Sequence, residues 1–248
     1  MKIADGIHML EIEAVTIGAP THIYPTLLQS GSDVILVDSG YPGQNCYPKI
    51  LQELHHLGID VQDITRVILT HQDLDHIGGL PPLLKDNPSI EVICHEAEKP
   101  YVEGEKKLVK ISRSAGHNLD HLPEHLKNAF LQVFQNPPTA PVHATVKDGQ
   151  TLPFCGGITV IHMPGHTPGN ICLYIQDARL LIAGDSLTAQ DGVLYGPVPE
   201  HAQDIGLAKQ SLSKLAGFNI ESIVCYHGGW VKDGGKQLQS IIKKNNRK

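Results

Sequence analysis

Residues 70–79 read THQDLDHIGG, and this stretch decides how the rest of the chain is interpreted. Two histidines and two aspartates fall within residues 71–76, and a glycine pair follows them. Residues 64–69, just before, predict a buried strand, so the polar cluster stands at a strand end. Because imidazole and carboxylate groups are common metal ligands, the stretch indicates one half of a metal site, with an ordinary polar loop as the alternative.

Three further segments repeat this arrangement, in which a predicted strand ends near a glycine and a candidate ligand follows. They are MPGHTPG at 163–169 with His166, AGDS at 183–186 with Asp185, and CYHGG at 225–229 with His227. A single histidine at a strand end is usually a surface or core residue, but four such places are hard to explain in that way. Loops at strand ends can bring ligands together from distant parts of a chain. The four segments therefore predict one shared metal site.

Composition excludes several classes of protein. The 248 residues carry a net charge of -6, which argues against a nucleic-acid-binding protein with a broad basic face. The five cysteines are scattered without a CxxC pair, which is typical of reduced thiols in a cytoplasmic protein. No signal peptide and no apolar run of membrane-spanning length is evident, so we expect no membrane partner.

Predicted strands and helices alternate in two blocks, before and after residues 96–140. Helical spacing is found at residues 45–58, 202–215 and 235–243. This order indicates a single α/β (α+β) domain over residues 1–248, with two sheets packed face to face and helices outside. Residues 96–140 are more charged and contain a predicted helix over 119–134, so we expect a partly helical insertion lying over the core.

With these motifs in order, the sequence resembles the metallo-β-lactamase-fold hydrolases along almost its whole length. The motifs that carry the resemblance are Asp38 in Asp-Ser-Gly, the HxDxDH stretch at 71–76, PGHTPG at 164–169, Gly184-Asp185, and His227. The resemblance implies a four-layer αββα sandwich with two metal ions at one edge of the sheets. It also implies that Asp38 orients a ligand histidine.

The resemblance further implies a ligand set for each metal ion. The first ion would be held by His71, Asp73 and His166, the second by Asp75, His76 and His227, and Asp185 would bridge both.

Asp73 departs from the family pattern, which usually has a histidine at this position. An aspartate still ligates zinc, the metal expected first, but its hard oxygen also favours iron or manganese. The flavodiiron branch of the superfamily carries a glutamate here and uses iron. The alternative is that Asp73 points away from the site and one metal ion is lost.

Two divalent ions lower the pKa of a shared water toward neutrality, so no serine or cysteine nucleophile is needed. We expect Asp75 to orient this water and to pass a proton to the leaving group. Lactonases of the family place a tyrosine near the substrate carbonyl from a similar part of the chain, which makes Tyr195 a second catalytic candidate. The competing interpretation of Tyr195 is a packing residue in a turn.

The leading functional hypothesis is a hydrolase that acts on a small ester, lactone or thioester. An iron enzyme of oxygen or sulfur chemistry, a phosphodiesterase and a non-catalytic binding protein are the alternatives. The expected partner is a small molecule, with a homodimer as the expected assembly.

Two further sets of polar residues were weighed as functional candidates and given simpler interpretations. The lysines at 106, 107 and 110 could attract an anionic substrate, although a solvated face explains them as well. His121 and His125 have metal-binding spacing, although a solvated helix face is the simpler interpretation.

Overall fold

The first of the two large sheets carries the opening motif. The computed structural model describes residues 1–16, 19–43, 46–114 and 124–245. Within them, the first sheet has the order β1-β2-β5-β6-β7-β8-β9. Its strands are β1 (Lys2–Ala4), β2 (Ile7–Met9), β5 (Thr26–Ser30), β6 (Asp33–Val37), β7 (Arg66–Ile68), β8 (Glu91–His95) and β9 (Ala144–Val146). Because β6 to β9 are parallel, the loops after β6, β7 and β8 leave the sheet at one edge.

The second sheet carries the other three motifs. Its order is β10-β11-β12-β13-β16-β17, and β13 pairs with β16 in parallel. The strands are β10 (Thr151–Leu152), β11 (Ile158–His162), β12 (Ile171–Ile175), β13 (Leu180–Ile182), β16 (Ser222–Cys225) and β17 (Gly229–Val231). Two small hairpins complete the strands: β3 (Ile12–Thr16) with β4 (Ala19–Ile23), and β14 (Thr188–Gln190) with β15 (Val193–Tyr195).

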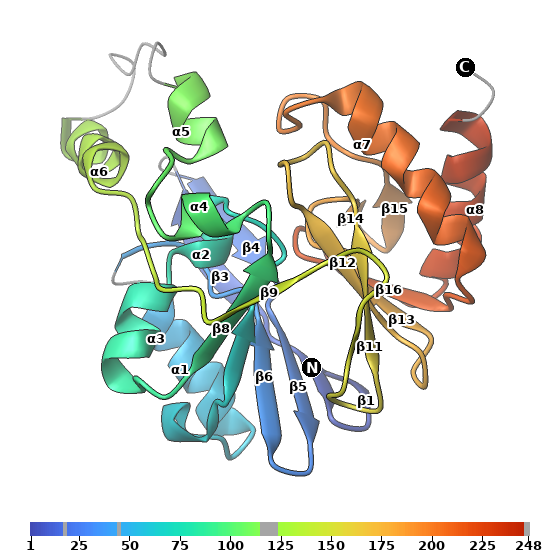
Figure 1. The fold of residues 1–248 in the computed structure, drawn as a ribbon, viewed down its shortest axis with the longest axis horizontal. Helices are drawn as coiled ribbons and strands as arrows, with labels where there is room; N and C mark the ends of the chain where they lie inside the picture. Colours follow the sequence, from blue (N-terminus) through green and yellow to red (C-terminus); the bar gives the residue numbers. More distant parts are fainter. Residues whose placement is uncertain (17–18, 44–45, 115–123, 246–248) are drawn as a thin grey trace.

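Helices cover the outer face of each sheet (Figure 1). On the first sheet lie α1 (Tyr47–His56), the 3-10 turn η1 (Val61–Asp63), α2 (Leu74–Ile77) and α3 (Leu80–Asp86), and on the second lie α7 (Ile205–Ser211), η2 (Leu212–Gly217) and α8 (Gly234–Asn245). One apolar cluster, including Ile35 and Leu173, fills the space between the sheets. The predicted αββα order is therefore confirmed.

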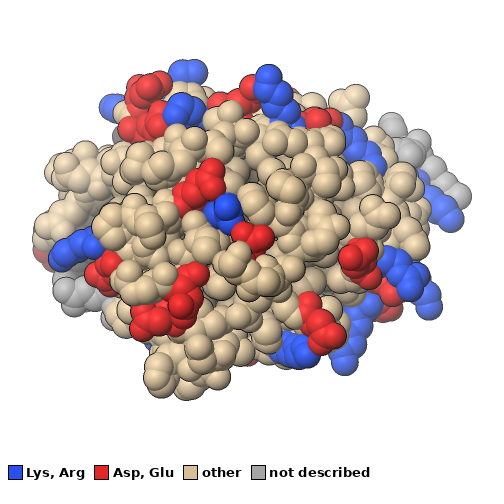
Figure 2. Space-filling model, turned by 60° about the horizontal axis from the view of Figure 1, so that its bottom comes forward, with Lys and Arg blue, Asp and Glu red and all other residues tan. Residues whose placement is uncertain are grey.

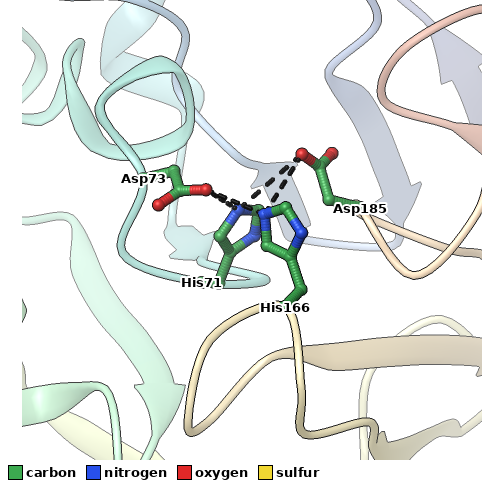
Figure 3. Close-up of side chains that lie close together, drawn as sticks. All are labelled: His71, Asp73, His166 and Asp185. Atoms are coloured by element: carbon green, nitrogen blue, oxygen red, sulfur yellow. Dashed lines mark hydrogen bonds and ion pairs between the residues drawn. The ribbon is translucent and has the colours of Figure 1, made fainter. Parts of the chain in front are cut away.

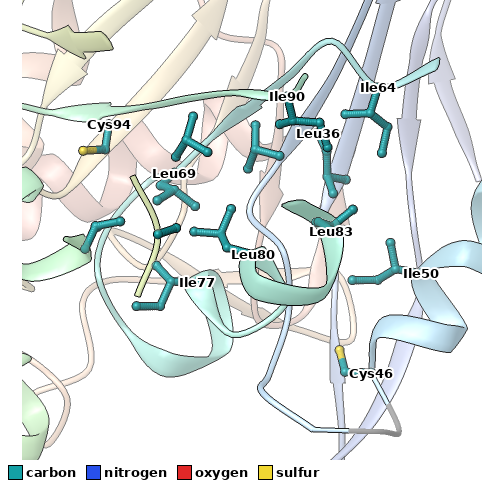
Figure 4. Close-up of a cluster of buried hydrophobic side chains, with 14 of the residues drawn as sticks. Leu36, Cys46, Ile50, Ile64, Leu69, Ile77, Leu80, Leu83, Ile90 and Cys94 are labelled. Carbon is teal, nitrogen blue, oxygen red and sulfur yellow. The ribbon is translucent and has the colours of Figure 1, made fainter. Parts of the chain in front are cut away.

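The outer helices are held by the apolar faces that their sequences predict. In α1, Ile50 and Leu54 are four positions apart and fully buried, because this spacing puts both side chains on one side of a helix. They join the cluster that contains Leu36 from β6 and Leu83 from α3 (Figure 4). A second cluster packs α8 against the other sheet through Leu238 and Ile242.

The segment between β8 and β9 carries three short helices over the first sheet. They are α4 (Lys99–Val102), α5 (Val109–Ser114) and α6 (Glu124–Gln135). The helix predicted over 119–134 is observed from Glu124 onward, and residues 119–123 lie outside the described part. Figure 1 shows α5 and α6 at the same end of the molecule as α7.

The helix predicted over 202–215 begins later and ends differently. Asp204 accepts a hydrogen bond from the backbone N–H of Leu207, which caps the first turn of α7. From Leu212 the chain continues as a 3-10 helix. The cap explains why the regular helix starts at Ile205 rather than Ala202.

The surface gives two further observations. In the face shown in Figure 2, Lys and Arg side chains alternate with Asp and Glu side chains, without a continuous basic area among the described residues. Across the described ranges, we find no helix with the length and apolar character needed to cross a membrane.

Candidate metal centre

The four sequence motifs meet where the two sheets present neighbouring strand ends. His71, Asp73 and His76 follow β7, and Asp38 follows the adjacent parallel strand β6. His166 lies in the loop between β11 and β12 of the other sheet. Asp185 follows β13 and His227 follows its parallel neighbour β16. Parallel pairing in both sheets thus brings residues up to 156 positions apart into one site, counting from His71 to His227.

The first group of candidate ligands consists of His71, Asp73, His166 and Asp185, all buried (Figure 3). Asp73 Oδ2 lies 2.9 Å from His71 Nε2 and 2.8 Å from His166 Nε2. Asp185 Oδ2 is 3.4 Å from His166 Nε2. One atom from each residue lies within 4.8 Å of the others, which allows all four to reach a single ion. Asp73 thus points into the site, as the sequence interpretation requires.

The second group consists of Asp75, His76 and His227. Asp75 Oδ2 lies 3.0 Å from His227 Nε2 and 3.6 Å from His76 Nε2. Asp185 also reaches this group, with Oδ1 at 3.4 Å from His76 Nε2 and Oδ2 at 3.5 Å from His227 Nε2. Asp185 therefore stands between the two groups.

Several candidate ligand atoms in this site make no hydrogen bond to a described residue, although His76 Nε2 and Asp185 Oδ1 lie 3.4 Å apart. They are Asp73 Oδ1, His76 Nε2 and Asp185 Oδ1, and each is buried. Buried polar atoms without a hydrogen bond are costly, whereas a metal ion would use the lone pairs that these atoms carry. The residues present therefore fit a metal site.

Charged neighbours keep Asp73 as a carboxylate, which is the form that binds a metal ion. Burial alone would raise the pKa of Asp73, but the Lys110 ammonium and His71 outweigh burial and hold this pKa well below its usual range. For His166, burial lowers the pKa and favours the neutral ring that metals bind. The charged carboxylate and neutral imidazole are the protonation states that a metal ion requires.

A buried network behind the ligands fixes their orientation. The carboxylate Oδ2 of Asp38 lies 2.9 Å from His76 Nδ1. The same oxygen accepts a hydrogen bond of 2.8 Å from the Thr70 hydroxyl, and Asp38 Oδ1 accepts the Thr70 backbone N–H. The ring of Tyr226 lies 3.9 Å from the ring of His76. Asp38 therefore occupies the orienting position that the sequence interpretation gave it.

Glu98, at the start of α4, links the two histidine loops. Its side chain is fully buried. It accepts hydrogen bonds from Gln72 Nε2 at 2.8 Å, the Thr167 hydroxyl at 2.8 Å and the Gly169 backbone N–H at 2.5 Å. The carboxylate thus ties the loop of His71 to the loop of His166.

Sequence reasoning missed Glu98, Thr70 and Tyr226. Glu98 was hidden in a charged run, and Thr70 and Tyr226 were passed over as neighbours of stronger ligand candidates. Thr70 and Tyr226 each stand directly before a candidate ligand histidine at a strand end, and this position was their only signal in the sequence.

A cavity of about 550 Å³ opens over the ligands. It is lined by Asp73, Asp75, His166, Asp185 and His227, and also by Lys110 and His201. Lys106 and Lys107 are exposed, as a solvated face predicts. Lys110 differs from both, because its Nζ contacts Asp73 and lies 3.1 Å from His166 Nε2.

The structure does not bring Tyr195 into this cavity. Its side chain is about half exposed on β15 and lines a neighbouring groove with Lys209 and Lys244. Tyr195 therefore stays outside the residues to which we assign a catalytic role. His121 lies outside the described residues, and of His125 only its place in α6 is described.

Comparison with known proteins identifies the family of the chain. Residues 18–227 match the sequence model of the Metallo-beta-lactamase superfamily. The probable metallo-hydrolase YflN of Bacillus subtilis is 28% identical over 96% of this chain and 89% of its own length. An atrochrysone carboxyl ACP thioesterase of Pseudocercospora fijiensis is 25% identical over 82% of this chain and 46% of its own length.

Solved structures show the same fold. A metallo-beta-lactamase family protein of Thermus thermophilus superposes with a TM-score of 0.74 and 21% identity, over 99% of this chain and 81% of that one. A metallo-beta-lactamase from Pontibacter korlensis gives a TM-score of 0.69 and 13% identity, over 100% and 98%. With the match over residues 18–227, these likenesses show that the chain belongs to the Metallo-beta-lactamase superfamily and is an enzyme of that type.

Proposed function

We propose that this protein is a hydrolase with a dinuclear metal centre that cleaves a small ester, lactone or thioester. The observation that carries the proposal is the position of Asp185, whose two carboxylate oxygens face both candidate ligand groups. A carboxylate between two ligand groups suits two ions better than one. The first ion would be held by His71, Asp73 and His166, and the second by Asp75, His76 and His227.

When bound, two divalent ions supply polarisation of a substrate carbonyl and a water of lowered pKa. Asp75 lines the cavity with its Oδ2 atom near both His76 and His227. We assign to Asp75 the removal of a proton from the attacking water and its delivery to the leaving atom. The water oxygen bonds to the carbonyl carbon, the carbon–oxygen or carbon–sulfur bond breaks, and an acid and an alcohol or thiol result.

The cavity supports a small substrate with an apolar part. Its volume of about 550 Å³ is in the usual range for small-molecule sites. Apolar side chains make up much of the wall around the ligands: Leu74, Leu108, Ile111, Phe134 and Val198. The similarity to a fungal thioesterase gives the thioester some preference among the three substrates.

Zinc is the metal we expect first, and Asp73 is the reason to test iron and manganese. A carboxylate in place of an imidazole makes the first ligand group harder and more negative. This same feature supports an iron enzyme of oxygen or sulfur chemistry as the second candidate function. Iron-loaded protein that consumes oxygen and hydrolyses none of the three substrate types would favour the second candidate.

We also propose that the protein acts on its small-molecule substrate in the cytoplasm, as a homodimer. All five cysteines are free thiols in the structure, and four of them are buried, which suits a reducing compartment. Fractionation of the source cells and sedimentation of the purified protein would test these two points.

The proposed activity can be tested with metal-loaded protein and a short panel of substrates. The panel comprises p-nitrophenyl acetate, an acyl N-acetylcysteamine thioester, γ-butyrolactone and bis(p-nitrophenyl) phosphate. Asp185→Asn should lower hydrolysis at least about a hundredfold, since loss even of groups behind the ligands costs about 10–100-fold. Asp191→Asn, on an exposed turn nearby, is the matched control and should keep full activity. Hydrolysis of the phosphate alone would contradict the proposed carbonyl substrate.

A further inference from the structure

Lys110 is the single Lys or Arg side chain among the described residues that line the cavity. It belongs to α5, in the segment between β8 and β9, and not to any of the four ligand motifs. Its side chain is 35% exposed and its Nζ contacts Asp73 Oδ2. Lys110 therefore reaches from the cavity wall to the edge of the first ligand group.

The backbone around Lys110 is fastened to the metal site. The backbone N–H of Val109 donates to Gln72 Oε1 at 2.7 Å, and Gln72 in turn donates to Glu98. The neighbouring side chains of Leu108 and Ile111 are buried in the core on the outer face of the first sheet. These contacts hold the backbone at the start of α5 beside the cavity that Lys110 lines.

Metal binding would change the partners of this ammonium group. The carboxylates that line the cavity are Asp73, Asp75 and Asp185, and each is a proposed metal ligand. Once these carboxylates share their charge with two divalent ions, positive charge exceeds negative charge on the cavity wall. Lys110 would then be a cation whose charge no further carboxylate balances among the described lining residues, because all three of these carboxylates would bind metal ions.

We propose that Lys110 binds a carboxylate on the substrate, so that the substrate is the ester, lactone or thioester of an acid that carries a second carboxylate. This inference rests on the proposed function, since it assigns the substrate class of the same site. The reacting carbonyl would lie at the metal ions, the second carboxylate at Lys110, and the short chain between them against the apolar wall. Lys106 and Lys107 are exposed to solvent, whereas Lys110 contacts Asp73 inside the cavity. A solvated face therefore does not explain the position of Lys110.

The test compares two thioesters that differ only in one charge: succinyl and succinamoyl N-acetylcysteamine. Wild-type metal-loaded protein should prefer the succinyl compound in kcat/KM by about tenfold or more, the size expected for a hydrogen bond to a charged group. Lys110→Gln should abolish this preference, because the succinyl compound should lose about tenfold more kcat/KM than the succinamoyl compound, and Lys110→Arg should keep the preference. Lys107→Gln, an exposed lysine three positions away, is the matched control and should behave as wild type.

A binding experiment separates this inference from the proposed function. Calorimetry of metal-loaded protein should show about tenfold tighter binding of succinate than of succinamate, each of which has one carboxylate for the metal ions. Lys110→Gln should bind both equally. If this result holds while no thioester is hydrolysed, the proposed activity fails and the assignment of Lys110 stands.

Three results would overturn the assignment of Lys110. They are equal binding of succinate and succinamate by wild type, an equal loss of both thioesters in Lys110→Gln, and a loss of metal in Lys110→Gln that explains its lower activity. The metal content of every variant is therefore measured beside its activity. The last result would mean that Lys110 supports the proposed metal ligand Asp73 and does not bind the substrate.

Discussion

His76 Nδ1 lies 2.9 Å from the carboxylate of Asp38, although the two residues are 38 positions apart. The contact exists because the parallel strands β6 and β7 end side by side. It leaves His76 Nε2 directed at Asp185. His76 of the second candidate ligand group is thus oriented by a residue that belongs to neither candidate ligand group.

Replacement of Asp38 should weaken metal binding without removing a ligand. Asp38→Asn should lower the affinity for the second metal ion by about 10–100-fold, the usual effect of changing a partner of a ligand histidine. Asp33→Asn, at the opposite end of the same strand, is the control, since Asp33 pairs with Arg66 far from the site. Competition with a chelator measures both affinities, and equal affinities in Asp38→Asn and wild type would contradict this role.

Glu98 should be needed for stability as well as for the site. Glu98→Ala leaves the amide of Gln72, the Thr167 hydroxyl and the Gly169 N–H without their buried acceptor. We expect the free energy of unfolding to fall by roughly 3 kcal/mol, because each unsatisfied buried group costs about 1–3 kcal/mol and some will find water.

Urea unfolding of metal-free protein measures the effect of Glu98 directly. Glu96→Ala is the matched control, because Glu96 is exposed and forms a surface ion pair with Lys147. Surface pairs of this kind contribute about 0–1 kcal/mol. Similar losses in the two variants would mean that the Glu98 network does not stabilise the fold.

Gly228, directly after the candidate ligand His227, should tolerate no side chain. Its φ of +106° is a backbone conformation that residues with a side chain rarely adopt, and a Cβ atom would overlap the backbone oxygen of Ala189. Gly228→Ala should therefore lower the free energy of unfolding by more than about 3 kcal/mol. Gly192→Ala also changes a residue of positive φ but meets open space, so it should cost only about 1–2 kcal/mol. Thermal melts that show equal losses would contradict the steric account.

His95 should make the protein less stable as the pH falls. Burial, helped by charge repulsion from His162, whose ring is stacked on His95, lowers the pKa of His95 to about 4. In the unfolded chain His95 is protonated as the pH falls below its ordinary pKa of 6.5, whereas in the folded protein it stays neutral down to about pH 4. Stability is therefore lost as the pH falls from about 6.5 toward 4.

The non-titrating variant His95→Asn tests this pH dependence. In metal-free protein with a chelator present, its free energy of unfolding should fall less between pH 7 and pH 5 than that of the wild type. Urea unfolding at both pH values gives the two differences. An equal fall in both proteins would show that His95 is not the group responsible.

The candidate ligands that the structure brings together each have a local signal in the sequence. His71, His166, Asp185 and His227 each follow an apolar run and stand near glycine, and such a pattern marks a strand end whatever the tertiary structure. Parallel pairing then brings these ends together in both sheets. The layers could be predicted for a similar reason, since buried runs and amphipathic helices alternate along the chain.

The remaining site residues could not be predicted because their roles depend on tertiary placement. Lys110 and Lys107 lie in the same charged stretch, and only the position of α5 directs one of them into the cavity. Glu98 acquires its role from loops 26 and 71 positions away. Tyr195 has the expected position in the sequence, but the β14–β15 hairpin puts it in a different groove.

The central claim is that two metal ions bind and that Asp73 is a ligand of one of them. Elemental analysis of the purified protein, beside Asp73→Ala and Asp73→His, tests this claim most directly. The account predicts two ions per chain in wild type, a fall toward one in Asp73→Ala, and two again in Asp73→His. One ion per chain in all three proteins would contradict the dinuclear centre and the role of Asp73.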